Sequence, residues 1–166
     1  MNLYDVTIPV LDRSLGNLSA LLRRGEEFAG DKGLEPQSII GSRLTPDMYP
    51  LSSQVHIATD TAKGCACRLA GKDVPKWADT EVTFEDLQAR IARTRDLLSS
   101  FDRNAFDDAQ HKPIMMRFAG QDLIFLGLDY VNSLALPNFY FHLSVAYSIL
   151  RVQGVTLGKF DFLGKP

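Results

Sequence analysis

The chain has 166 residues, and its 18 basic and 20 acidic side chains give a formal net charge of −2 at pH 7. This length allows a full hydrophobic core, so we expect one domain over residues 1–166. No basic surplus indicates a nucleic-acid partner. No apolar run approaches the roughly 18 residues of a membrane span, so we expect no membrane partner.

The N-terminus and the cysteines indicate the cellular compartment. The first residues, MNLYDVTIPV, lack a basic segment followed by an apolar run, which predicts no signal peptide. Two cysteines, Cys65 and Cys67, are too few for a disulfide framework. These features predict a reduced, cytoplasmic protein.

The first predicted helix covers residues 2–29. Its apolar residues recur at steps of three and four, which is one face of an α-helix: Ile8, Leu11, Leu15, Leu18 and Leu22. Glycines at positions 30 and 33 end it. The connector over residues 33–50 is long for a bundle, and Thr45-Pro46-Asp47 resembles a helix cap with a first-turn proline.

A second helix is predicted over residues 51–70, with an apolar stripe at positions Leu51, Val55, Ala58, Ala62, Ala66 and Leu69. His56 and Asp60 are four residues apart and share one side of this helix. They lie beyond the edge of the stripe, which predicts incomplete burial. Cys65 is assigned to the core. Cys67 lies about 200° further around the axis, so the two cannot hold one metal ion.

A third helix is predicted over residues 84–101, after a loop that covers 71–82. Thr83 and Asp86 resemble a capping box at its start. Phe84, Leu87, Ile91, Leu98 and Phe101 form the inward face. The arginines at positions 90, 93 and 95 are expected to face water.

Two β-prone runs follow, over residues 114–118 and 122–126. They predict a small hairpin with Gly120-Gln121 as a type II′ turn. An isolated hairpin is marginal in water, so we expect it to lie against the bundle or against a partner chain.

The last helix is predicted over Pro137–Gly154, PNFYFHLSVAYSILRVQG. It is apolar nearly all round, which indicates that neighbouring helices enclose it. Pro137 either begins this helix or kinks a longer one that starts near residue 128. The tail over residues 155–166 is expected to fold back and be anchored by Phe160, Phe162 and Leu163.

His142 is the polar residue in this helix that most needs a partner, because an unpaired buried polar group costs about 1–3 kcal/mol. Asn138 lies four residues earlier, and His56 and Asp60 repeat this spacing on the second helix. If the two helices face each other, these four side chains line one pocket. Candidate ligands for zinc, nickel, manganese or iron are His56 and His142, with Asn138 or Asp60. The alternative is a pair of hydrogen-bonded core histidines without a metal.

The chain carries no familiar catalytic signature, so its catalytic residues are unknown. It lacks the G-x-S-x-G motif of acyl-transfer enzymes. Gly158-Lys159 is not a phosphate-binding loop, because Gln153 stands where the first glycine belongs.

Three motifs resemble those of one family. RL-x-PDM-x-PL, PNF-x-FH and G-x-x-LGK-x-DFLG are similar to segments of the DinB-like superfamily, in a branch classed as a domain of unknown function. The resemblance covers essentially the whole chain. It implies an all-α four-helix bundle in up-down-down-up order, a fold shared with YfiT-like proteins and with mycothiol- or bacillithiol-dependent enzymes. It also implies a homodimer.

Metal-binding members of that family take one histidine from the second helix and two from an H-x-x-x-H pair on the last. His56 matches the first position and His142 one of the other two, whereas the third would be Asn138 or Ala146. The resemblance therefore favours a metal-free binding or interaction protein, with a His56/His142 pocket for an unknown small molecule. The alternative is a divalent-metal-dependent thiol transferase or hydrolase that uses a metal-bound water. Whether the protein is an enzyme is undecided.

Overall fold

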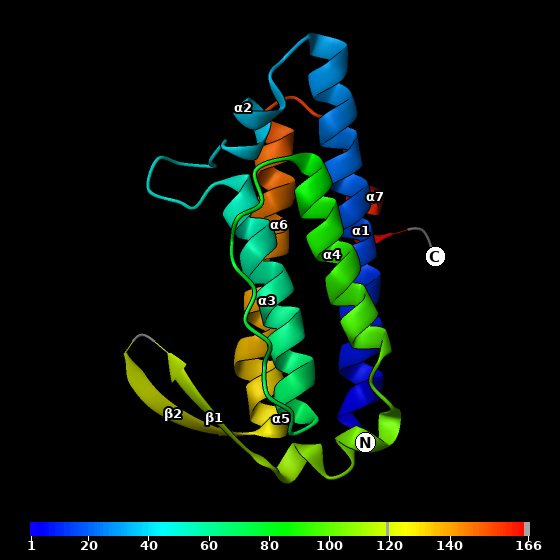
Figure 1. Cartoon of the computed structure of the whole chain (residues 1–166), viewed down its shortest axis with the longest axis vertical. Coiled ribbons are helices and arrows are strands. Elements are labelled where there is room, and N and C mark those ends of the chain that lie inside the picture. The colour runs from blue at the N-terminus through cyan, green and yellow to red at the C-terminus, as the bar shows by residue number, and fades with distance from the viewer. Residues whose placement is uncertain (119, 165–166) are drawn as a thin grey trace.

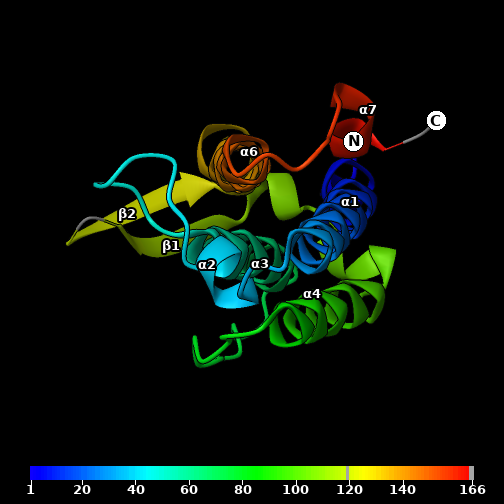
Figure 2. The same cartoon turned by 90° about the horizontal axis from the view of Figure 1, so that it is seen from above.

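The computed structural model describes residues 1–118 and 120–164, and over these residues the chain is mostly helical with one small antiparallel hairpin. In this described part four long helices form a bundle (Figure 1): α1 (Leu3–Lys32), α3 (Leu51–Leu69), α4 (Phe84–Ser99) and α6 (Leu136–Val152). Seen from above in Figure 2, α3 lies between α4 and α6. The predicted helical class is confirmed.

Shorter elements connect and flank these helices. They are α2 (Pro36–Ile40), the 3₁₀ turns η1 (Arg103–Phe106) and η2 (Ala109–His111), the strands β1 (Pro113–Phe118) and β2 (Gln121–Leu126), α5 (Gly127–Tyr130), the π-helical turn η3 (Val131–Ala135) and α7 (Lys159–Leu163).

α1 buries the predicted stripe, and its leucines at 11, 15, 18 and 22 are fully buried. Gly33 ends the helix in the left-handed conformation, with φ of 63°, which a residue with a side chain seldom adopts. The connector differs from the prediction. Thr45-Pro46-Asp47 forms a turn, in which the Thr45 hydroxyl donates to Asp47 and the Met48 N–H donates to the Thr45 carbonyl.

α3 and α4 have nearly the predicted bounds. The capping box of α4 is present, because Thr83 accepts from the Asp86 N–H and the Asp86 carboxylate accepts from the Thr83 N–H. Cys65 lies in the core, and Cys67 is buried as well. Residues 70–83 form an extended connection that returns along α3 before α4 begins (Figure 1). This connection brings its side chains against both helices.

The hairpin has the predicted strands but a different turn. Phe118 pairs with Gln121, so the loop consists of residues 119 and 120 and Gln121 belongs to β2. Ala119 lies outside the described residues. On the inner face, Phe125 packs against Tyr130, whereas Met115 and Ile124 on the other face are 77% and 71% exposed.

Helical structure continues from α5 through η3 into α6, and Pro137 lies in the first turn of α6. A proline cannot donate the N–H that an uninterrupted α-helix requires, and its ring crowds the preceding turn. The wider π turn immediately before Pro137 accommodates this defect. Pro137 therefore both begins α6 and marks an irregularity in a longer helical segment.

The tail folds back onto α1 through α7. Phe162 packs edge-on against Tyr147, and its carbonyl accepts from the Asn17 side chain. The other two predicted anchors are wrong, because Phe160 and Leu163 are 69% and 45% exposed. Among the described helices, none combines the length and the apolar character needed to cross a bilayer.

Gly127 is a position where a side chain would disturb the fold. A Cβ atom there would overlap the Ala109 carbonyl oxygen, which is backbone and has no rotamer to change. We expect Gly127→Ala to lower the free energy of unfolding by about 1–3 kcal/mol. Gly30→Ala is the control: a Cβ there meets nothing within 4 Å, and alanine should stabilise the helix by up to about 1 kcal/mol. Urea unfolding measures both, and equal effects would contradict the prediction.

Candidate functional site

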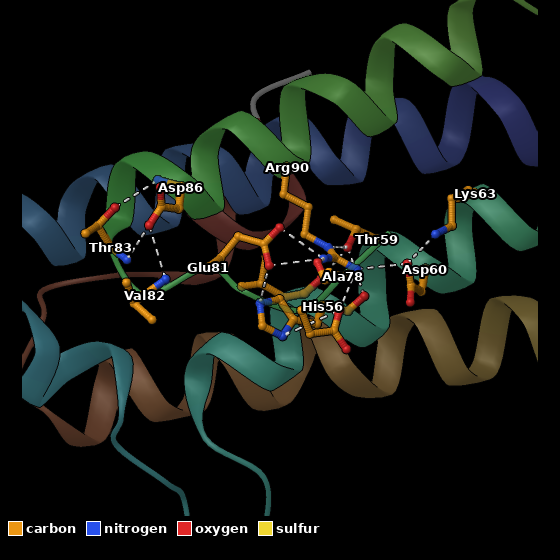
Figure 3. Close-up of polar contacts among 12 residues, drawn as sticks. His56, Thr59, Asp60, Lys63, Ala78, Glu81, Val82, Thr83, Asp86 and Arg90 are labelled. Carbon is orange, nitrogen blue, oxygen red and sulfur yellow. Dashed lines mark hydrogen bonds and ion pairs between the residues drawn. The ribbon is translucent and has the colours of Figure 1, made fainter. Parts of the chain in front are cut away.

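A buried arginine lies where α3, the connection over residues 70–83 and α4 meet (Figure 3). Arg90 is only 3% exposed. Its Nε donates to the Thr59 hydroxyl at 2.8 Å, and its Nη1 donates to the Ala78 carbonyl at 3.1 Å. The guanidinium also contacts three carboxylates: Asp60 and Asp79 at 2.9 Å, and Glu81 at 3.0 Å. We call Arg90, these three acids and His56 the Arg90 cluster.

The prediction that Arg90 faces water is therefore wrong. Helical periodicity places position 90 off the inward face of α4, and in an isolated helix it would be solvated. The returning connection covers this side of α4 and supplies Ala78, Asp79 and Glu81 as acceptors. Arg93 and Arg95 are exposed, as predicted.

Lys63 brings a second cation to the cluster. Its Nζ lies 2.7 Å from the Asp60 carboxylate and 4.2 Å from the centre of the Trp77 ring. Three carboxylates thus face two cations, so that two of the three negative charges are compensated and the formal net charge is −1 when His56 is uncharged. Such compensation is what allows a charged side chain to be buried.

His56 is more buried than the sequence predicts, with 8% exposure. Its Nε2 lies 3.0 Å from Glu81 Oε2 but off the line of a hydrogen bond, so this buried nitrogen has no aligned partner in the described structure. Its Nδ1 lies 3.9 Å from Asp79. Burial, and then the charge of Arg90, lower the pKa of His56, whereas the carboxylates act in the opposite direction.

His142 has a different partner. Its Nδ1 lies 2.7 Å from Gln54 Oε1, and the Gln54 amide nitrogen donates to the Tyr49 carbonyl at 2.9 Å. An amide oxygen only accepts, so Nδ1 carries the proton in this pair. Burial lowers the pKa of His142. On the same side of α3, Asn138 donates to Thr61 at 2.8 Å.

The four residues of the predicted pocket do not meet at one point. Gln54 and His56 are two residues apart on α3, about 200° around its axis, so the side that meets His142 is not the side that carries His56. In the described part of the chain, one group of three or more His, Cys, Asp or Glu residues has its ligand atoms within 4.8 Å of one another. This group is His56, Asp79 and Glu81, without Asp60 or His142.

Asp60 and Asn138 do share a hollow, which lies between α3 and the helical segment from α5 to α6. Its volume is about 240 Å³, and its lining includes Ile57, Thr61, Arg68, Met116, Tyr130 and Leu134. Apolar walls with a few convergent polar groups are typical of small-molecule sites. We call this space the α3–α6 hollow.

The His56 group has the donor atoms that a divalent cation prefers. However, Arg90 already uses the same carboxylates, contacting both Glu81 oxygens and Asp79 Oδ1. A metal ion would have to compete with a guanidinium that is itself buried, and a displaced guanidinium would lose its partners. The geometry therefore fits a structural ion-pair network better than a metal centre.

Sequence reasoning missed Gln54, Asp79, Glu81 and the role of Arg90. A signal for Gln54 exists, because it lies three residues after Leu51 and four before Ala58, inside the apolar stripe of α3. A buried amide at such a position needs a partner. The two acids lie in a connection without regular periodicity, and no pattern indicates what they contact.

Comparisons with known proteins agree with the fold. Residues 3–163 match the family model for a domain of unknown function, DUF1993. A crystal structure described as a DinB family member from Shewanella denitrificans is 38% identical, with a TM-score of 0.92 over 99% of this chain and 93% of that chain. A search of curated proteins gave no significant match.

Removing the Arg90 guanidinium should destabilise the protein strongly. In Arg90→Met, the largely covered Glu81 carboxylate loses its cation, and Thr59 and Ala78 lose a donor. We expect the free energy of unfolding to fall by about 2–4 kcal/mol, as when one partner of a buried ion pair is removed. Arg95→Met is the matched control, because Arg95 pairs with Asp12 at the surface and should cost less than about 1 kcal/mol. If urea unfolding shows similar losses of unfolding free energy for Arg90→Met and Arg95→Met, the prediction is wrong.

The two buried histidines should make stability depend on pH. Their pKa values in the folded protein lie below the ordinary value of 6.5, so protonation favours the unfolded chain. Their contribution is complete above pH 6.5 and is lost as the pH falls through the lowered values. We expect the free energy of unfolding to decrease below pH 6.5, and less steeply in His56→Gln and in His142→Gln. Identical slopes in all three proteins would contradict this origin.

Proposed function

The chain belongs to the DUF1993 family, a DinB-like family of unknown function, and on this basis we propose that it is a metal-free protein that binds a small molecule in the α3–α6 hollow. The observation that carries the metal-free part of this proposal is the hydrogen bond of 2.7 Å between Gln54 and His142. It places a side-chain amide, which is a poor metal ligand, against His142, the residue that matches a ligand position in metal-binding members of the family.

The rest of the α3–α6 interface supports the proposal. Asn138, four residues before His142, is bound to Thr61, and Ala146 offers no ligand atom. A metal site of the kind that the family resemblance implies needs three histidines, and at the α3–α6 interface His142 is the single one of them present in the described structure. The residues present do not fit that metal site.

The α3–α6 hollow is the part of this interface that suits a ligand. Ile57, Met116 and Leu134 give it apolar walls, whereas Thr61 and Arg68 add polar groups. A volume of about 240 Å³ is small for a ligand pocket, which favours a small metabolite or fragment over a large cofactor.

The finer points of the fold and assembly are also proposals. We propose the up-down-down-up order, which the return of residues 70–83 along the bundle in Figure 1 supports, because it lets α3 and α4 run in the same direction. The homodimer stays a prediction, with the exposed apolar face of the hairpin around Met115 and Ile124 as one surface that a second chain could cover. The cytoplasmic location stays a prediction as well.

A second candidate, a divalent-metal-dependent thiol transferase or hydrolase, has one observation in its favour. The buried Nε2 of His56 lacks an aligned partner, and it lies beside Glu81 and Asp79. In this alternative these three residues would bind the metal and Arg90 would move aside.

Metal content separates the two candidates. We expect protein purified without a histidine tag, after incubation with Zn²⁺ and removal of excess ion, to contain far less than one equivalent by elemental analysis. Stoichiometric zinc would overturn the metal-free proposal. The variants His56→Ala and His142→Ala would then show where it binds: loss in His56→Ala alone would favour the Arg90 cluster, and loss in His142→Ala alone the α3–α6 interface.

A further inference from the structure

Arg68, near the end of α3, is a half-buried cation that lines the α3–α6 hollow. Its Nη1 donates to the Tyr130 hydroxyl at 3.2 Å. Within the part of the chain that the structure describes, no carboxylate forms an ion pair with it. Arg90, Arg95 and Arg103, by contrast, all contact aspartates or glutamates. The charge of Arg68 is thus left without a counter-charge beside an open space.

Gly64 makes room for this guanidinium. A Cβ atom at Gly64 would overlap Arg68 Nη1, and the three atoms nearest to that position all belong to the Arg68 guanidinium. Glycine inside a helix is unfavourable relative to alanine. Its presence here has a local explanation, because it allows the Arg68 side chain to lie close along α3 and reach Tyr130.

The acid that lines the same hollow does not neutralise Arg68. Asp60 lies 2.7 Å from Lys63 and 2.9 Å from Arg90, on the side of α3 that faces the Arg90 cluster. Asn138 donates to Thr61. Asp60 is therefore engaged by cations outside the hollow, and Asn138 and Thr61 are paired with each other, whereas Arg68 keeps N–H groups without a protein acceptor in the described structure.

Tyr130 adds a second donor at the same place. Its hydroxyl oxygen accepts from Arg68, so its own hydrogen is free to be donated to a ligand. Burial raises the pKa of Tyr130 to about 12, which keeps this hydroxyl protonated at neutral pH. A guanidinium and a hydroxyl that both donate into one space suit an anionic oxygen pair.

We propose that the α3–α6 hollow binds a small organic monocarboxylate, whose carboxylate contacts Arg68 and Tyr130 and whose short apolar body lies against Ile57, Met116 and Leu134. This inference rests on the proposed function and specifies its ligand class. One planar guanidinium matches one carboxylate in charge and geometry. A phosphate dianion would leave a charge uncompensated in this partly apolar space.

Two probes of nearly the same shape test the charge requirement. Sodium hexanoate and neutral hexanamide are titrated into the ¹⁵N-labelled protein, and the amide signals of Thr61, Tyr130 and Asn138 are followed by NMR. We expect hexanoate to bind at least about tenfold more tightly than hexanamide, because a charge-assisted hydrogen bond is replaced by a neutral one.

Three variants assign this preference to Arg68. In Arg68→Gln hexanoate should bind no more tightly than hexanamide, whereas Arg117→Gln, the same change at an exposed position of the hairpin, should keep the preference. Gly64→Ala provides a test that does not remove the charge. It should keep or raise the melting temperature, since only the flexible end of Arg68 must move, yet it should weaken hexanoate binding.

The outcomes distinguish this inference from the proposed function. Equal binding of both probes in the hollow, or a preference that survives Arg68→Gln, would overturn the monocarboxylate and leave small-molecule binding intact. No shift with either probe would overturn the monocarboxylate as well. The metal content of the purified protein judges the metal-free proposal independently of these titrations.

Discussion

The Arg90 guanidinium joins three consecutive segments of the chain: α3, the connection over residues 70–83 and α4. It donates hydrogen bonds to Thr59 and Asp60 on α3 and to Ala78 and Glu81 on the returning connection, and it forms an ion pair with Asp79, while the side chain itself comes from α4. A guanidinium can be buried only when its donors and its charge are satisfied in this way. The same contacts fasten the long connection over residues 70–83, bury His56 beneath it and occupy the carboxylates that a metal ion would need.

α3 therefore has two polar sides with different properties. Toward α4 and the connection, charges of both signs compensate one another within the protein. Toward the segment from α5 to α6, three pairs cross the interface: Gln54 with His142, Thr61 with Asn138, and Arg68 with Tyr130. The first two pairs are neutral, and only the third carries a charge. That pair lies near the end of α3, and both of its residues line the hollow.

Features that depend on local periodicity could be predicted from the sequence, and features that depend on distant contacts could not. The stripe of α1, the capping box at Thr83 and the two hairpin strands follow from residue type and spacing. Arg90 could not be placed, because its burial depends on a connection whose path has no periodic signal. The pocket of His56 and His142 rested on an assumed rotation of α3. Gln54, inside the apolar stripe, was the residue that could have indicated the correct rotation.

Whether the charges on a polar side of α3 are compensated is a better guide to a ligand site than whether that side carries a histidine. Perturbed titratable groups occur both at functional sites and in structural ion-pair networks, so the shifted pKa of His56 does not decide between them. At the Arg90 cluster, the buried cation and the carboxylates meet one another's requirements, and an added ion would have to displace an existing partner. At Arg68 the positive charge lacks a carboxylate in the described structure and borders a hollow with apolar walls. An anion that binds there would displace no carboxylate from Arg68, which is why the ligand is sought at the arginine with the weaker network.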